Sequence, residues 1–204
     1  MALLFAAALV GLIAGWLRSR AQHHSYMTFT LQHSWLVFVA FLMQWMAFTL
    51  PITREITPTR WASAALVFSQ ILLLVFVWFN RSRPAIWLLG LGLFLNFMVI
   101  AVNDGFMPIS PTAVTHLFPN APAGSWEIGQ QLGTGRDVVL TVDQTRLWFF
   151  SDRFLSSILD YRTAFSLGDV AIAAGAMGLL WELGGNPDHK GEKVLWLLVF
   201  KKAT

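Results

Sequence analysis

The sequence predicts an all-α integral membrane protein, in which a five-helix transmembrane bundle carries a small extracytoplasmic cap of irregular and β structure. Hydrophobic residues make up 56% of the 204 residues and charged residues only 12%, about half the charged share of ordinary soluble domains. The apolar residues fall in five segments close to the length that crosses a bilayer. One long polar stretch, residues 103–166, separates the fourth segment from the fifth.

The five predicted spans cover residues 2–17, 34–50, 61–79, 85–102 and 168–183. Pro51 ends the second span, Pro84 opens the fourth, and the Gly-rich run after residue 183 ends the fifth. The chain therefore divides into a four-span membrane bundle (1–102), an extracytoplasmic cap segment (103–166), a fifth span (167–184) and a cytoplasmic tail (185–204).

Basic residues predict the orientation. With the N-terminus outside, eight of them flank the inner ends of the spans and only two lie in the short outer loop. The eight are Arg18, Arg20, Arg81, Arg83, Lys190, Lys193, Lys201 and Lys202, and the two are Arg54 and Arg60. We expect a bacterial cytoplasmic-membrane protein with a cytoplasmic C-terminus. The first segment lacks the basic start of a secretory signal, so it is predicted to be a retained span.

Composition excludes several functions. The net charge is only +3, and the basic clusters beside apolar segments are typical of topology signals, so nucleic acid is not an expected partner. The chain has no cysteine, and its spacings contain no zinc pattern, nucleotide loop or serine triad. Of the five histidines only His33 lies near a span end, so no metal and no cofactor is predicted.

The cap segment is mixed. Four prolines between residues 108 and 122 predict irregular backbone, residues 137–142 are β-prone, and the aromatic run 146–150 suits the bilayer surface.

Several short motifs resemble those of a catalogued bacterial family of multi-pass membrane proteins whose function is undefined. They are the run 103–108, the pair Arg136-Asp137, the element 145–153, and the run 166–169 followed by Ile172 and Gly175. The resemblance covers nearly the whole chain and implies no activity.

A weaker resemblance is to signal peptidase II, an aspartyl protease that trims lipoproteins. Asn103, then Asp152-Arg153, then the run 165–175 follow the order of its motifs, although that family has two spans between the first motif and the first aspartate. The resemblance implies that Asp152 and Asp169 are catalytic and share a proton.

The same motifs have structural interpretations. Ser166-x-x-Asp169 before an apolar run is a capping box, and Asn103-Asp104-Gly105 can close the fourth helix. Asp152 is expected to pair with an arginine. Gln44, Gln70 and Asn96 lie inside spans and are expected to bind other helices, and Gly11-x-x-x-Gly15 favours close packing of the first helix.

We expect a non-enzymatic accessory or scaffold subunit of a membrane assembly, conceivably an energy-transducing one, with lipid and other membrane subunits as partners. The alternatives are an aspartyl membrane hydrolase and the binding of a lipid-like ligand under the outer cap. Candidate ligand-binding residues are Asn103, Asp104, Arg153 and Ser166. Residues 153–168 have no proline or glycine before Gly168, so this stretch is predicted not to fold back, and Asp152 is predicted to lie apart from Asp169.

Overall fold

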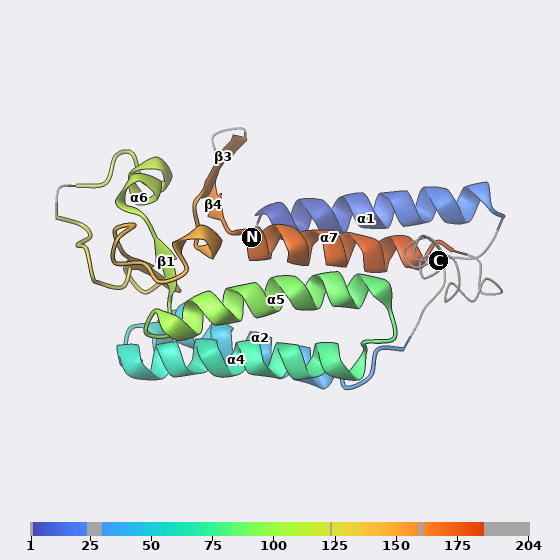
Figure 1. Ribbon diagram of the computed structural model, residues 1–204, viewed down its shortest axis with the longest axis horizontal. Coiled ribbons are helices and arrows are strands. Elements are labelled where there is room, and N and C mark those ends of the chain that lie inside the picture. Colours follow the sequence, from blue (N-terminus) through green and yellow to red (C-terminus); the bar gives the residue numbers. More distant parts are fainter. Residues whose placement is uncertain (1, 24–29, 123, 159–160, 186–204) are drawn as a thin grey trace, which may run out of the picture.

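Five helices run side by side along the long axis of the molecule, and the cap lies at one end of them (Figure 1). The computed structural model describes residues 2–23, 30–122, 124–158 and 161–185. The long helices are α1 (Ala2–Ala21), α2 (Trp35–Phe48), α4 (Thr59–Phe79), α5 (Pro84–Val102) and α7 (Leu167–Glu182). Short helix α3 (Pro51–Arg54) lies between α2 and α4, and short helix α6 (Pro111–Leu117) belongs to the cap. Nearly all of the predicted cytoplasmic tail lies outside the described residues.

Among the described residues, three helices are long and apolar enough to cross a membrane: Leu3–Ala21, Thr59–Phe79 and Pro84–Val102. The second predicted span is helical over only the 14 residues of α2, or about 21 Å at 1.5 Å per residue. A positive φ at His33 precedes it, and Pro51 begins α3 directly after it. Helix α7 has 16 residues, or about 24 Å. The chain therefore has the long apolar helices of a membrane protein.

Glycines bring α7 close to its neighbours. Helix α5 lies between α4 and α7, α1 packs on α7, and α2 packs on α4. A Cβ at Gly92 would stand 2.6 Å from the backbone nitrogen of Ile172, and one at Gly175 would stand 2.7 Å from the Cα of Leu89. A Cβ at Gly11 would stand 2.9 Å from the Cα of Met177, so this glycine packs α1 against α7, as predicted.

Polar side chains within the bundle bind across helices. The Nε2 of Gln44 on α2 donates to the Oγ of Ser69 on α4 at 2.8 Å, and Asn96 on α5 binds α7. The interhelical role predicted for these two amides is confirmed. Gln70 differs, because its buried Oε1 has no hydrogen-bond partner among the described residues. Opposite the cap, Arg83 forms an ion pair with Glu182 at 3.2 Å.

The cap contains two small sheets. Strand β1 (Met107–Ile109) pairs in parallel with β2 (Asp137–Val139), and Met107 lies opposite Asp137. Strand β3 (Phe154–Ile158) pairs antiparallel with β4 (Tyr161–Phe165). A 3₁₀ turn, η1 (Trp148–Phe150), contacts α5. The β-prone run 137–142 is thus a strand only in its first half.

The prediction that residues 153–168 would not fold back is wrong. Phe154 pairs with Phe165 across the β3–β4 hairpin, and their rings stack with centroids 5.7 Å apart. Apolar or aromatic residues face each other at both ends of the pairing, Phe154 with Phe165 and Ile158 with Tyr161, and these cross-strand pairs support it although residues 153–167 contain no glycine or proline. The hairpin returns the chain to the bundle, so Asp152 and Asp169 flank the same element.

Candidate functional site

The motif that follows α5 fastens the cap to the bundle. The Nδ2 of Asn103 donates to the carbonyls of Val99 and Arg146 at 2.8 and 2.9 Å, and its Oδ1 accepts from the Arg146 amide at 3.0 Å. The Gly105 amide donates to the Ile100 carbonyl, and both Asp104 and Gly105 have positive φ. The predicted helix cap is therefore present. The buried side chain of Asn103 therefore connects the end of α5 to the segment around residue 146.

The motif at the start of α7 forms a closed ring of hydrogen bonds. The Oγ of Ser166 accepts from the Asp169 amide, and the Ser166 amide donates to the Oδ2 of Asp169, so the predicted capping box is present. The Oγ of Ser166 also donates to the Oδ1 of Asn96 at 2.9 Å, and the Nδ2 of Asn96 donates to the Oδ1 of Asp169 at 2.9 Å. Both oxygens of Asp169 are thus occupied, Oδ1 in joining α7 to α5 and Oδ2 in capping the start of α7.

Three carboxylates and one arginine interact electrostatically where the cap meets the bundle. Burial raises the pKa of Asp137 above its usual range, while Arg136 lowers it and Asp169 raises it. Burial raises the pKa of Asp152 well above its usual range, and the negative charges of Asp137 and Asp169 add to this effect. The positive charge of Arg136 lowers the pKa of Asp152 and so offsets part of this increase. The Nη1 of Arg136 also donates to the Oε1 of Gln44 on α2 at 3.3 Å.

Asp152 is not paired with an arginine, contrary to expectation. Neither ion pair of the described residues includes it, and its Oδ1 is buried without a hydrogen-bond partner. The Asp152 backbone amide donates to the carbonyl of Pro108 in β1, which holds this segment alongside the strand. The arginine pairing fails because Arg153 is held by aromatic rings instead. Its guanidinium carbon lies 4.5 Å from the Trp148 ring centre and 5.0 Å from that of Phe149.

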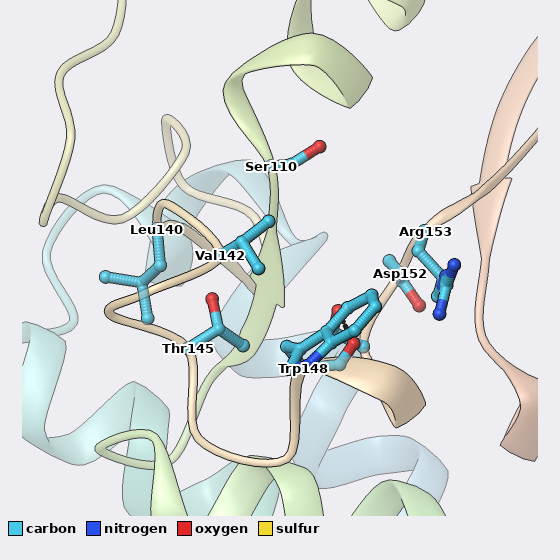
Figure 2. A pocket seen from close by; sticks show the side chains of 8 residues that line it. Ser110, Leu140, Val142, Thr145, Trp148, Asp152 and Arg153 are labelled. Carbon is cyan, nitrogen blue, oxygen red and sulfur yellow. Dashed lines mark hydrogen bonds between the residues drawn. The ribbon is translucent and has the colours of Figure 1, made fainter.

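Asp152 and Arg153 both line a cavity of about 210 Å³ in the cap. Figure 2 shows Leu140, Val142 and Trp148 forming its apolar lining. Ser110, Thr145 and Ser151 add hydroxyl groups. Asp169 is not part of the lining, so the cavity brings together one predicted catalytic residue and one predicted ligand-binding residue.

The arrangement suits ligand binding better than proton sharing. A catalytic pair needs carboxyl oxygens that touch each other or one water molecule, whereas both oxygens of Asp169 are bound to α5 and to its own helix start. No cluster of three or more potential metal ligands occurs in the described parts of the chain. The sequence did not predict that Trp148, Ser110 and Asp137 lie near Asp152, because these residues come from separate segments and no local pattern connects them.

The chain belongs to the family described as Family of unknown function (DUF5317), whose model matches residues 28–181. No curated protein matches the chain. No solved structure matches it either. The comparisons show no similarity to signal peptidase II.

Substituting Ser166 with alanine tests the ring at the start of α7. We expect Ser166→Ala to destabilise the protein by at least the roughly 0.5–2 kcal/mol of a lost N-cap, because it also leaves the buried Oδ1 of Asn96 without a donor. Asp169→Asn should cost less, since its amide oxygen still accepts one hydrogen bond. Thermal unfolding in mild detergent measures both effects. Loss of a peptide-hydrolase activity in Asp169→Asn with unchanged thermal stability would contradict the structural role.

Asp152→Asn tests the buried carboxyl group. Because the folded-state pKa of Asp152 lies well above the ordinary value of 3.8, the wild type loses stability as the pH rises from that value toward the folded-state pKa. Asparagine cannot ionise, so the variant should melt higher than the wild type at pH 8, by roughly 2–4 °C for each kcal/mol gained. The two should melt alike near pH 3.5. A variant that melts lower than the wild type at pH 8 would show that Asp152 is a stabilising anion.

Proposed function

We propose that this protein is a non-enzymatic accessory or scaffold subunit of a bacterial cytoplasmic-membrane assembly, with five spans and its N-terminus outside. The observation that carries the proposal is an open groove of about 620 Å³, lined mainly by α4 with Met43 of α2 and Ala101 of α5. Its lining includes the small residues Ser63, Ala64, Ala65 and Ala101 beside the larger side chains of Trp61 and Phe68, and Asp104 and Gly105 lie at its cap end. Small side chains let a second helix approach closely within a membrane. Close packing of this kind is one of the interactions that drive helices to associate in lipid. The occupant we propose is a transmembrane helix of a partner subunit.

The polar groups of the bundle support a role without catalysis or transport. Gln44 binds Ser69, and Asn96 binds Ser166 and Asp169. These bonds fix helix positions, and a relay for protons or ions would instead need ionisable groups along the spans. The two carboxylates of α7 lie at its ends, Asp169 in the first turn and Glu182 at the last residue.

The aspartyl hydrolase is the second candidate, and the electrostatic coupling of Asp152 with Asp137 and Asp169 favours it. Coupled carboxyl groups can divide the roles of acid and base. The geometry supports this candidate less well, because Asp169 is already bound through both oxygens.

The five-span topology and orientation rest on where the basic residues lie. Arg18 stacks over Trp181 at 5.0 Å, and Arg83 pairs with Glu182, so these arginines share the end of the bundle opposite the cap (Figure 1). Helices α2 and α7 are short for a span, and their flanking residues would complete the crossing or the bilayer would thin around them.

Single cysteines in this cysteine-free chain test the orientation. In intact cells a membrane-impermeant maleimide should label Asn120→Cys in the cap, whereas Gln22→Cys at the opposite end should react only after permeabilisation. The reverse labelling pattern would overturn the proposed orientation.

Ala64→Leu tests the partner helix. Ala64 is exposed in the groove, so leucine should fill the groove without disturbing the monomer, and a stoichiometric membrane subunit that copurifies with the wild type in mild detergent should be lost. Ala6→Leu, the same substitution at an exposed position of α1, is the matched control and should keep the subunit. A wild-type protein that purifies as a lone monomer would contradict the scaffold function.

A further inference from the structure

The cap cavity is lined by hydrogen-bond acceptors that lack donors. Asp152 lines this cavity, and its Oδ1 is buried and receives no hydrogen bond in the described part of the chain. Thr145 and Ser151 already use their hydroxyl hydrogens, donating to the carbonyls of Thr141 and Trp148 at 2.8 and 2.7 Å. Their oxygens keep free lone pairs. The cavity therefore offers acceptors from three side chains, and a primary ammonium group carries three N–H donors.

An anion site adjoins these acceptors. The Arg153 guanidinium is held over the rings of Trp148, Phe149 and Phe154, with its carbon 4.5–5.5 Å from the ring centres. It forms no ion pair among the described residues, and its side chain is exposed. The aromatic contacts fix its position and leave its N–H groups for a ligand. A planar guanidinium fork suits a phosphate group.

The size and position of the cavity limit the ligand. Its 210 Å³ is room for about seven water molecules at roughly 30 Å³ each, and it lies below the range of about 300–1,000 Å³ typical of drug-sized ligands. Trp148 and Phe149 in η1 are 43% and 51% exposed, and η1 packs on the end of α5. Exposed aromatic rings at the end of a membrane helix are typical of the headgroup level of a bilayer.

We propose that the cap cavity binds a phosphoethanolamine group, with the primary ammonium at Asp152 and the phosphate at Arg153. The proposal goes beyond the scaffold function, and neither depends on the other. A quaternary choline group would fail in this cavity, because it has no N–H to donate to the buried Oδ1. The group can belong to a phosphatidylethanolamine lipid or to a free small molecule, since both present the same chemistry.

Binding should depend on pH. The charged groups that act on Asp152 from the surrounding elements are Asp137, Asp169 and Arg136, with Arg153 beside it. Burial and the two aspartates raise the pKa of Asp152, so at any pH below that raised pKa the binding of an ammonium group must displace a proton. Affinity for the amine should therefore rise with pH through the folded-state pKa and level off above it.

The full-length protein in mild detergent, titrated with short-chain lipids, tests the proposal. Dihexanoyl phosphatidylethanolamine should bind roughly tenfold or more tightly than dihexanoyl phosphatidylcholine, which is the scale of one charge-assisted hydrogen bond. Asp152→Asn should remove this preference, and Arg153→Gln should lower the affinity for both lipids by the same factor. Arg162→Gln, an exposed arginine outside the cavity lining, is the matched control and should change neither affinity. Thermal unfolding establishes that each variant is folded.

Val142→Phe gives an independent check. The larger side chain narrows the cavity at Val142, which is 58% exposed, and leaves the carboxyl group of Asp152 intact. The substitution should therefore lower the affinity for the ethanolamine lipid, and it can be measured even if Asp152→Asn does not fold. Free O-phosphoethanolamine that binds as tightly as the lipid would support the site and identify a soluble ligand, whereas much weaker binding would identify the lipid. Equal affinity for the two lipids, or an unchanged preference in folded Asp152→Asn, would overturn the proposal.

Discussion

The hydrogen-bond ring of Asn96, Ser166 and Asp169 is the constraint on which the bundle depends. Helix α1 packs on α7, and α7 joins the other helices mainly through α5, so this contact holds two parts of the bundle together. A carboxylate at this depth is tolerated because it accepts two hydrogen bonds and lies in the first turn of a helix, where the helix dipole favours negative charge. Gly168 belongs to the same constraint, since a Cβ there would stand 2.6 Å from the Cγ of Asn96.

The cap takes its position from the ends of the same two helices. Asn103 at the end of α5 holds the backbone of Arg146, and Ser166 ends the β3–β4 hairpin and begins α7. The segment with Asp152 runs between these two anchors and bridges to Ile109 in β1. Its backbone is therefore held against β1, with one carboxyl oxygen buried. This anchoring explains how a buried oxygen without a hydrogen bond can persist, because relaxation toward water would break several hydrogen bonds at once.

Local chemistry made part of this structure predictable. Apolar length and flanking prolines located the five long helices, and the caps at Asn103 and Ser166 follow from residues three or fewer positions apart. The β3–β4 hairpin was missed because residues 153–167 contain no glycine or proline, whereas the pairing depends on contacts between the two strands. The bond from Asn96 to Asp169 spans 73 residues. Which helix an intramembrane amide would meet could not be read from local sequence.

The two aspartates of the weaker resemblance differ in how their oxygens are used. Both carboxyl oxygens of Asp169 accept hydrogen bonds that hold the start of α7 in place. Asp152 contributes a backbone amide to the cap and leaves a buried oxygen unbound. A buried acceptor without a donor destabilises the folded chain unless something supplies one. Stability alone therefore does not explain the carboxyl group of Asp152, and a ligand that donates a hydrogen bond would account for both its burial and its neighbours.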